Sequence, residues 1–460
     1  MTNAGRQVEP ESAPSSDANK PDRRHRPEHW AQTGVLRRLL KNASLLLSSK
    51  GLAALAGVAY LAVAARDLGP HNFGLLILVH AYAIVFRELT SFKSWQAVIR
   101  YGTDHVIDAD TESFHRLLRL TTMLDIAGAL LGVLLAVVAL PLIGTRFGFS
   151  AELLPFVALY CLGTAFALKS TPTGILRLFD RYGLVARHGL IAPMVRLVGV
   201  LAIHFSGLSF YYYLAVWFLA DVTSTGVLLW LGWREFGQHE MAYGFRLRGP
   251  WRSASHQKIW PFIWNSNLHG TVNLAGSHIP TLMSGLVLGP SAAGVVKIAQ
   301  EMAGLLSKPA QLLSDTIYPE LARLVVAHDS RRTARVIFRA SLMGLGFAAV
   351  VITLAHFGGE GLILAVLGSG YASTFDLLML LIIAAGIQMT CFPMDPMMFA
   401  LGRPGVSFRI KLFTSLVQVV SMYYLLSHLG VTGAGVAMIL GTALSGVLLF
   451  AATLYQFRAK

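Results

Sequence analysis

Six basic side chains stand inside long apolar segments of the sequence, where a charge can hold an anion: Lys50, Arg87, Lys169, Arg196, Lys297 and Lys308. A charge in the middle of a bilayer costs on the order of 3 kcal/mol or more, so such residues usually face a cavity or a partner. Lys50 stands in the stretch LLLSSKGLAAL, beside two serine hydroxyls and a glycine. That environment suits a phosphate. The alternative is that Lys50 extends toward the lipid headgroups at the end of its helix.

Carboxylates in the same apolar segments could neutralise these cations or carry an ion. Asp125, Asp221 and Glu301 are the candidates for ion coupling, and nothing in the sequence selects among them. Asp221 stands in the middle of its segment and can pair with either Lys169 or Arg196.

Segment 291–318 carries four charged residues of alternating sign: Lys297, Glu301, Lys308 and Asp315. Their spacings of four, seven and seven place all four on one face of a helix. Such a stripe either forms salt bridges between helices or lines the wall of a water-filled cavity. The two interpretations are compatible.

Segment 260–287 carries amide and imidazole side chains. Asn265, His269 and Asn273 recur every four residues, and Asn267 lies beside them. Asn and His can hydrogen-bond sugar hydroxyls as donors and as acceptors. They can also join neighbouring helices. The number of polar groups in one segment favours the cavity, and it makes these four residues the candidates for contacting a glycan.

The elements that must position these residues are membrane helices. The chain has 460 residues, of which 54% are hydrophobic and 13% are charged, and its mean hydropathy is +0.57. Apolar stretches of 18 or more residues indicate membrane-spanning helices. We identify twelve such segments: 43–65, 73–92, 120–143, 152–173, 184–205, 209–232, 260–287, 291–318, 336–357, 373–398, 406–427 and 432–455. The sequence therefore predicts an all-α polytopic membrane protein.

Other features of the sequence narrow its chemistry. Residues 1–34 are polar and predict a disordered cytoplasmic tail rather than a signal peptide. Cys161 and Cys391 both stand in apolar segments and predict neither a disulfide framework nor a metal site. No Walker A pattern, Gly-x-Ser-x-Gly or His-Glu-x-x-His motif occurs. We therefore expect no cofactor, and no ATPase or familiar hydrolase.

Basic residues predict the orientation of the segments. Loops assigned to one side hold 25 Lys and Arg residues, whereas the other side holds Arg66 and Arg146. The positive-inside rule then places both termini in the cytoplasm. The net charge of +14 is largely this topology signal, with some contact to anionic lipid, and it does not require a nucleic acid.

One turn occurs twice in the sequence. Leu-Gly-Pro followed by Gly four positions after the proline stands at 68–74 and again at 288–294, 220 positions later. Arg, Gly and Arg at 181, 183 and 187 recur at 403, 405 and 409, a shift of 222. These matches predict a duplicated six-helix unit, with halves at 35–233 and 260–460. The stretch 234–259 mixes aromatic and basic residues and predicts a cytoplasmic linker lying on the inner leaflet.

With its twelve segments, two halves and the early turn ARDLGPHNFG, the chain resembles the multidrug/oligosaccharidyl-lipid/polysaccharide (MOP) exporter superfamily. Within it, the chain is most similar to Wzx-type polysaccharide flippases. The motif that carries this resemblance is Arg66, Leu68, Gly69 and Gly74. The resemblance covers roughly residues 40–457 and implies two parallel repeats around a V-shaped central cavity.

The resemblance also implies a function and a location. Wzx-type proteins move undecaprenyl-diphosphate-linked oligosaccharides across the bacterial inner membrane by alternating access, for surface polysaccharide synthesis. The six basic residues would then bind the diphosphate, and Asn265, Asn267, His269 and Asn273 the glycan. The expected partners are this lipid-linked sugar, membrane lipids, and a polysaccharide polymerase with its chain-length regulator.

Three alternatives stay open at this point. A cation-coupled multidrug exporter of the same fold usually has an acid in helix one or seven, and segments 43–65 and 260–287 have none. A polysaccharide polymerase or ligase needs a larger outer loop than this chain offers. A lipid II flippase usually has fourteen spans.

Overall fold

The computed structural model describes residues 35–164, 168–251, 276–327, 329–371 and 374–458, together with 259–260, 262–263, 267 and 272. The predicted tail, 1–34, lies outside the described residues. Regular structure in the described part is entirely helical. Its first half consists of α1 (Val35–Thr90), α2 (Ser94–Ile107), α3 (Thr111–Ile143), η2 (Thr145–Phe147), α4 (Leu154–Thr164), α5 (Ser170–Leu178), α6 (Tyr182–His188), α7 (Ile191–Ser206), α8 (Phe210–Gly237) and η3 (Glu240–Ala242). The second half consists of α10 (Ile279–Leu288), α11 (Pro290–Val326), α12 (Ser330–Leu367), η5 (Ser369–Tyr371), α13 (Thr374–Cys391), α14 (Met394–Ala400), α15 (Pro404–Leu429) and α16 (Thr432–Arg458).

Membrane-spanning helices dominate this fold. Within the described residues, eight helical stretches are long and apolar enough to cross a bilayer: Ser48–Ile107, Thr111–Ile143, Tyr182–Ser206, Phe210–Gly237, Arg331–Ala365, Thr374–Ala400, Pro404–Leu429 and Thr432–Gln456. The first of these contains two predicted segments, 43–65 and 73–92, because α1 continues through the turn between them. The all-α multi-pass membrane fold is confirmed, while the count of twelve spans stays a prediction.

The helices repeat local features half a chain apart. Gly69 has a φ of 68° and Gly289 a φ of 89°, and each precedes a proline that opens the next helix. Glycine tolerates this left-handed φ, and proline suits the first helical turn because its nitrogen needs no hydrogen bond there. The side chains of Asp110 and Asp329 likewise cap α3 and α12 by accepting a backbone N–H. In Asp110 this hydrogen bond holds the pKa of the carboxyl below its ordinary value. The predicted boundaries of the halves, 35–233 and 260–460, remain predictions.

Two of the predicted segments are interrupted. Segment 152–173 contains α4 and the start of α5, with Lys169 just before α5 and Pro172 in its first turn. Segment 184–205 is divided between α6 and α7, and Pro193 follows in the first turn of α7. Proline lacks the N–H that would continue the preceding helix, which accounts for a new helix beginning at each site. At the first interruption, Lys169 lies just before α5 and its side chain lines a cavity in the interior of the lobe.

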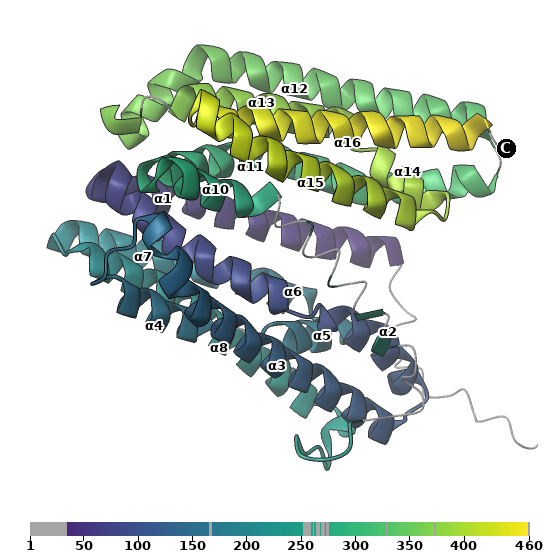
Figure 1. Cartoon of the computed structure of the whole chain (residues 1–460). Helices are drawn as coiled ribbons and strands as arrows, with labels where there is room; N and C mark the ends of the chain where they lie inside the picture. Colours follow the sequence, from purple (N-terminus) through teal and green to yellow (C-terminus); the bar gives the residue numbers. More distant parts are fainter. Residues whose placement is uncertain are drawn as a thin grey trace, which may run out of the picture.

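The helices form two lobes, shown in Figure 1. We call α1–α8 the N-terminal lobe and α10–α16 the C-terminal lobe. The terminal end of the bundle holds Val35 and Arg458, and the opposite end holds the turns at Gly69 and Gly289. The lobes lie close together at the opposite end and spread apart toward the terminal end.

The apolar cores follow the same division. The largest cluster combines both lobes and is built from residues toward the opposite end, such as Leu76, Val157, Ala293 and Leu378. Toward the terminal end the cores are separate: one gathers around Phe114 on α2, α3, α5 and α8, and another gathers on α11, α12, α14 and α16. A core shared by both lobes at the opposite end, with separate cores toward the terminal end, agrees with the predicted V-shaped arrangement.

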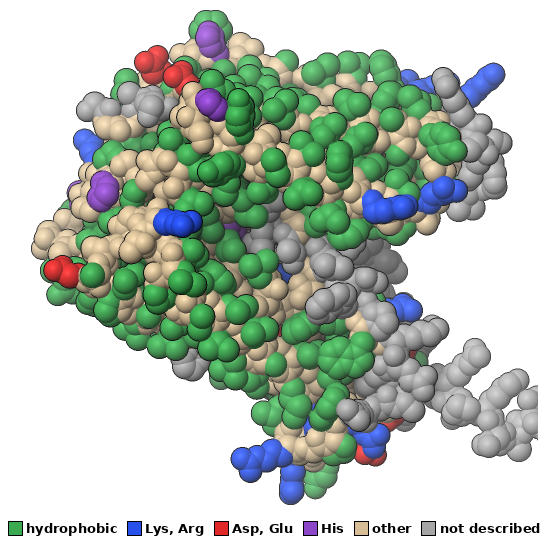
Figure 2. All heavy atoms as spheres, in the orientation of Figure 1, with side chains coloured by type: hydrophobic (Ala, Val, Ile, Leu, Met, Phe, Trp, Pro, Cys, Tyr) green, Lys and Arg blue, Asp and Glu red, His purple; other side chains and the backbone are tan. Residues whose placement is uncertain are grey.

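The flanks of the bundle carry the apolar surface that a bilayer requires. Leu130, Leu134 and Val138 recur every four residues on α3, and all three are exposed. Figure 2 shows apolar side chains over the flanks of both lobes on this face, with Lys and Arg mainly toward the terminal end. A contiguous apolar surface of this kind marks contact with lipid rather than water.

The segment after α8 is held against the N-terminal lobe by hydrogen bonds. His115 Nε2 lies 2.6 Å from the carbonyl oxygen of Met241, and Arg119 donates to the carbonyl oxygens of Arg246 at 2.6 Å and Pro250 at 3.1 Å. α8 itself runs to Gly237, so the predicted linker begins about one helical turn later than its predicted start at 234. The described part of the linker, 238–251, therefore belongs to the N-terminal lobe. Its contact with the inner leaflet stays a prediction.

Candidate functional site

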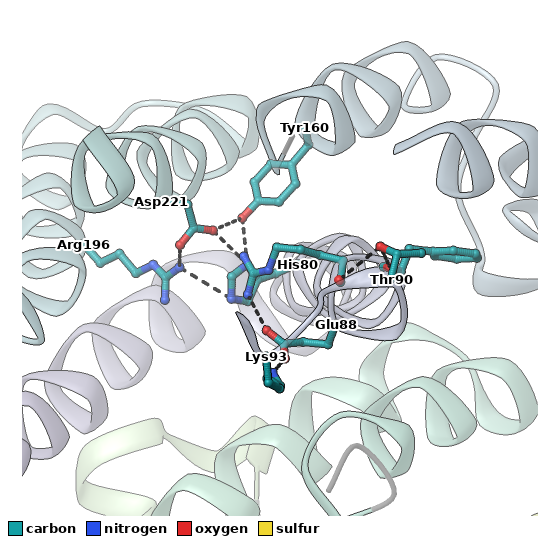
Figure 3. A network of polar contacts seen from close by, with 9 residues as sticks. His80, Glu88, Thr90, Lys93, Tyr160, Arg196 and Asp221 are labelled. Carbon is teal, nitrogen blue, oxygen red and sulfur yellow. Dashed lines mark hydrogen bonds and ion pairs between the residues drawn. The ribbon is translucent and has the colours of Figure 1, made fainter. Parts of the chain in front are cut away.

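Four polar side chains from four helices form a closed ring inside the N-terminal lobe (Figure 3). They are His80 on α1, Tyr160 on α4, Arg196 on α7 and Asp221 on α8. His80 Nδ1 lies 2.7 Å from Tyr160 Oη, which donates to Asp221 Oδ2 at 3.2 Å. Arg196 Nη2 donates to Asp221 Oδ1 at 2.9 Å and lies 3.5 Å from His80 Nε2. The predicted pairing of Asp221 is therefore with Arg196.

One arrangement of hydrogens satisfies every contact in the ring. Arg196 can only donate, so His80 Nε2 accepts and the proton of the imidazole stands on Nδ1. His80 Nδ1 then donates to Tyr160, and the tyrosine hydroxyl donates to Asp221. The ring thus holds a neutral histidine, a guanidinium and a carboxylate. A further proton on His80 would have to displace the guanidinium from Nε2.

Aromatic rings enclose the ion pair. Arg196 Nη1 donates to Tyr60 Oη at 3.4 Å, and the guanidinium carbon lies 5.9 Å from the Tyr60 ring centre and 5.6 Å from that of Trp217. The side chain of Arg196 is 10% exposed and that of Asp221 17%. A charge pair this far from water needs several additional contacts to offset its lost hydration. The cation–π contacts and the Tyr160 hydroxyl supply them.

A cavity of about 210 Å³ opens in the same lobe. Arg87, which helps to line it, lies two helical turns beyond His80 on α1. Its walls come from the end of α1, the start of α2, the middle of α3 and the start of α5: Arg87, Glu88, Ser91, Phe92, Lys93, Trp95, Asp125, Ala129, Lys169, Ser170 and Thr173. This cavity brings together two of the six predicted cations, Arg87 and Lys169, with Arg196 in the adjoining ring.

Glu88 neutralises part of the positive charge around the cavity. Lys93 Nζ donates to Glu88 Oε2 at 2.6 Å, and Arg87 Nη2 lies 3.5 Å from Glu88 Oε1. Figure 3 shows Glu88 and Lys93 at the end of α1. One carboxylate thus faces two cations, which leaves a positive excess on this wall.

Asp125 on α3 links this helix to α2 and α5 by hydrogen bonds at the wall of the cavity. Its buried carboxylate accepts from Ser94 Oγ at 2.6 Å and from the backbone N–H of Thr171 at 2.7 Å. Ser94 opens α2 and Thr171 stands in the first turn of α5, whose N–H groups have no partner within the helix. Asp125, a predicted candidate for ion coupling, therefore has a structural task at this position.

Lys169 is the cation with the greatest capacity for a ligand. It stands just before α5, is partly buried and lines the cavity. In the described part of the chain its ammonium group has neither a hydrogen bond nor an ion pair. Arg87 approaches a single carboxylate at 3.5 Å. A phosphate placed between Lys169 and Arg87 would receive charge-assisted hydrogen bonds from both.

Comparison with known proteins identifies the family. The family described as Polysaccharide biosynthesis protein matches residues 39–325, more than half of the chain. The chain belongs to this polysaccharide biosynthesis family. It is also similar to inner membrane protein YghQ of Escherichia coli (strain K12), with 29% identity over 354 residues that cover 76% of this chain and 98% of YghQ.

Comparison with solved structures shows that this family member has the MOP fold. An inward-facing multidrug resistance MATE family transporter of the MOP superfamily matches with a TM-score of 0.73 and 14% identity, covering 91% of this chain and 98% of that one. The lipid II flippase MurJ, in an inward closed conformation, matches with a TM-score of 0.62 and 14% identity, covering 89% and 87%. At this identity the likeness establishes the fold, which agrees with the fold that the sequence resemblance implies.

Two other predicted cations of this polysaccharide biosynthesis protein, Lys297 and Lys50, lie away from the cavity. Lys297 Nζ donates to Glu301 at 2.6 Å within α11 of the C-terminal lobe, so this salt bridge lies along one helix rather than between helices. Lys50 is exposed on α1 and does not line the cavity. The side chain of Lys308 lies outside the described part of the chain.

Three of the four residues predicted to contact a glycan lie outside the described residues. Asn265, His269 and Asn273 are not among the described residues. Asn267 is described, is helical and is 8% exposed. A role in binding sugar stays a prediction for all four.

The two repeats of this family member differ at the ring positions. At the shift of 220 set by the Leu-Gly-Pro turns, His80 corresponds to Gln300, and at the shift of 222 Arg196 corresponds to Gln418. The counterparts of Tyr160 are apolar, since residues 380–382 are Leu, Leu and Ile. Those of Asp221 fall within 441–443, which are Gly, Thr and Ala. The charged ring is therefore a property of the N-terminal lobe.

Several site residues carry no strong sequence signal. Tyr160 completes the ring from an apolar helix, where a buried tyrosine hydroxyl calls for a partner. Lys93 lines the cavity from the short connection between α1 and α2, and Trp95 lines it from the first turn of α2, next to a stretch that the sequence assigns to a loop. The signal that could have found Tyr160 is the single tyrosine within segment 152–173.

Proposed function

We propose that this protein is a flippase that carries a polyprenyl-diphosphate-linked oligosaccharide, with undecaprenyl diphosphate as the lipid, across the bacterial inner membrane. Membership of the polysaccharide biosynthesis family and the MOP fold support a lipid-linked sugar as the cargo. The relative YghQ is an inner membrane protein, which supports an inner membrane location for this chain. One observation carries the proposal: Lys169, partly buried and without an acidic partner among the described residues, faces a cavity beside Arg87.

The chemistry of this cavity suits the diphosphate rather than the whole cargo. Its volume of about 210 Å³ fits a phosphate-sized group and is below the range of about 300–1,000 Å³ that drug-sized ligands occupy. The diphosphate would lie between Lys169 and Arg87, with the Ser91 and Thr173 hydroxyls as neutral donors. The glycan would extend toward the space between the lobes, where Asn265, Asn267, His269 and Asn273 are the predicted contacts. The lipid tail would stay in the bilayer.

Transport would proceed by alternating access of the two lobes. The positive-inside rule makes the terminal end cytoplasmic, so the spread of the lobes at this end would admit cargo from the inner leaflet. An inward-facing MATE family transporter matches with a TM-score of 0.73 and an outward-facing one with 0.56, which supports an inward-facing state for this chain. Export would then require the lobes to close at the terminal end and to part at the opposite end. A polymerase and a chain-length regulator would receive the exported sugar.

Asp221 is the residue we propose for ion coupling, if transport is coupled. Asp125 accepts hydrogen bonds from Ser94 and Thr171, and Glu301 accepts one from Lys297. Asp221 is also engaged, by Arg196 and Tyr160, but unlike the other two it shares a ring with a histidine, and a proton arriving at His80 Nε2 would displace the guanidinium from it. No nucleic acid is proposed as a partner.

A multidrug exporter is the alternative that this charge distribution disfavours. Cationic drugs need an accessible carboxylate, whereas Glu88 and Asp125 on the cavity wall are both engaged by neighbouring donors. A transporter role also accounts for the family and the fold without any catalytic group, so we propose no enzymatic activity.

Binding of a short-chain analogue tests the proposal. Purified protein in detergent would be titrated with farnesyl-diphosphate N-acetylglucosamine. We expect Lys169→Met to raise the Kd about 10- to 100-fold, because a charge-assisted hydrogen bond contributes about 1.5–3 kcal/mol. Lys169→Arg should retain most of the affinity.

The matched control is Lys411→Met, which removes a lysine of the C-terminal lobe that pairs with Asp395 outside the cavity. It should leave the Kd unchanged. Equal affinity of Lys169→Met and the unaltered protein would refute the assignment of the cavity to the diphosphate.

A further inference from the structure

The repeated Leu-Gly-Pro turns of the two lobes meet each other at the opposite end of the bundle. A Cβ at Gly74 would lie 1.8 Å from the carbonyl oxygen of Pro290, so the backbones there are in direct contact. A Cβ at Gly294 would lie 3.0 Å from the Phe73 ring and 3.3 Å from the Cα and the nitrogen of Gly74. The last glycine of each motif is thus the point at which one repeat touches the other. No side chain fits between the backbones at Gly74.

Each proline of the motif is covered by a turn of the other lobe. A Cβ at Gly370, in the turn after α12, would lie 3.4 Å from Pro70 Cγ. A Cβ at Gly148, in the turn after α3, would lie 3.0 Å from Pro290 Cγ. Pro70 and Pro290 are 220 positions apart, and Gly148 and Gly370 are 222 apart. The two contacts are therefore the same contact made twice, once in each direction between the lobes.

One buried polar contact joins the lobes at this place. Tyr371 donates to the carbonyl oxygen of Ala65 at 3.0 Å, and its ring meets that of Phe73 edge to face with centres 6.4 Å apart. Tyr371 is 1% exposed and Phe73 is fully buried. These residues belong to the core cluster that both lobes share.

We infer that these four turns, 68–74, 144–149, 288–294 and 368–371, form a reciprocal clasp that seals the opposite end and must part for cargo to leave there. We call them the clasp. The inference rests on the proposed function, because a seal matters for a protein that alternates between two sides.

The composition of the clasp explains why it can close tightly and still release. Its contacts are glycine, proline and ring surfaces, which exclude water without placing a charge at the seam. The buried Tyr371 hydrogen bond and the Phe73 ring contact are the specific contacts that opening would break. Opening would separate two turn pairs that are related by the same pseudo-twofold axis, so both contacts would part together. The repeated motif therefore forms a turn within each half and also makes the contact between the two halves.

A disulfide across the clasp tests this inference. In a background with Cys161→Ala and Cys391→Ala, the pair Pro70→Cys and Gly370→Cys is designed to link the lobes, since a Cβ at 370 would lie 3.4 Å from Pro70 Cγ. The matched control is Gly199→Cys with Val216→Cys, which joins α7 to α8 inside one lobe, where a Cβ at 199 would lie 3.3 Å from Val216 Cβ. Disulfide formation would be read by mass tagging of the remaining thiols.

Each protein would then be reconstituted in vesicles with a fluorescent undecaprenyl-diphosphate N-acetylglucosamine, and the sugar reaching the outer face would be read with a lectin. Oxidation should lower the rate of the clasp pair at least tenfold, and a reductant should restore it. The control pair should keep its rate in both states. Failure of the clasp pair to cross-link, or full transport by its oxidised form, would overturn the inference.

Binding separates a failure of the clasp from a failure of the proposed function. The oxidised clasp pair should still bind farnesyl-diphosphate N-acetylglucosamine, because the cavity lies away from the clasp. If the unaltered protein neither binds nor transports the lipid-linked sugar, the proposed function is wrong.

Spin labels provide a measurement that does not depend on transport. Labels would be placed on Leu208→Cys and Leu429→Cys, exposed positions at the opposite end of the two lobes. In vesicles containing the lipid-linked sugar, the distance between them should gain a longer component that the oxidised clasp pair abolishes. An identical distribution with and without the clasp disulfide would overturn the inference.

Discussion

Replacing Arg196 with glutamine is the sharpest test of the buried ring, because the second repeat has Gln418 at the corresponding position. The ion pair joins Arg196 Nη2 to Asp221 Oδ1 at 2.9 Å, with side chains 10% and 17% exposed. At an effective dielectric constant of about 20, two unit charges at this separation attract by about 6 kcal/mol. Part of that attraction is offset by the hydration that both groups give up.

The expected result is an asymmetry between single and double variants. Arg196→Gln leaves Asp221 without its guanidinium and should lower the free energy of unfolding by about 3–5 kcal/mol. Asp221→Asn should do the same from the other side. The double variant removes both charges and keeps groups that can hydrogen-bond, so it should lie within about 1 kcal/mol of the unaltered protein.

The assay is unfolding in mixed detergent micelles, followed by the fluorescence of tryptophan, with Lys411→Met as the control. Lys411 and Asp395 form a partly exposed pair, whose loss should change the free energy of unfolding by about 1 kcal/mol or less. A double variant as unstable as the sum of the singles would refute the reasoning, since the two charges would then not depend on each other. Transport by the stable double variant then reports whether the ring serves function beyond stability.

Two further predictions concern the supports of the site. Asp125→Ala should lower the free energy of unfolding by about 3 kcal/mol in the same assay, because the Ser94 hydroxyl and the Thr171 N–H lose their acceptor. Asp125→Asn, which keeps one acceptor oxygen, should lose less. Arg119→Ala should raise the rate of trypsin cleavage after Arg246 about tenfold, because two carbonyl oxygens of the linker lose their donor.

A surface ion pair on α3 provides the controls for both. Glu112 and Arg116 pair with each other one helical turn apart, and the Glu112 side chain is 70% exposed. Glu112→Ala should leave stability nearly unchanged, and Arg116→Ala should leave the cleavage rate nearly unchanged. If Arg119→Ala resists trypsin as the unaltered protein does, the aromatic contacts of Phe245 are sufficient to hold the linker.

The helical architecture was predictable because hydropathy and the repeated turn act over long stretches. Burial of about 20 apolar residues is encoded in each segment separately, so no tertiary contact is needed to recognise it. The Leu-Gly-Pro turn is likewise local: Gly69 supplies the left-handed φ and Pro70 the start of the next helix. What that turn touches was not predictable, since the contact of Gly74 with Pro290 joins residues more than 200 positions apart.

The site was predictable in its residue types and less so in its grouping. Arg87, Lys169 and Arg196 are conspicuous because a charge in an apolar segment is costly, and the structure brings them into one lobe. Their separation from Lys50 and Lys297 depends on how the helices pack, which no periodicity encodes. Tyr160 was missed because a tyrosine disturbs an apolar segment much less than a charge does.

The charges of the N-terminal lobe have an electrical consequence. The cavity and the ring together hold four basic and three acidic side chains: Arg87, Lys93, Lys169 and Arg196 against Glu88, Asp125 and Asp221. The cavity and the ring thus carry one uncompensated positive charge, and where they lie within the bilayer the membrane voltage acts on it. A unit charge that crosses the full voltage drop changes energy by about 2.3 kcal/mol per 100 mV. In a cell that is negative inside, the voltage pulls this charge inward, and a bound diphosphate reverses the direction of that pull.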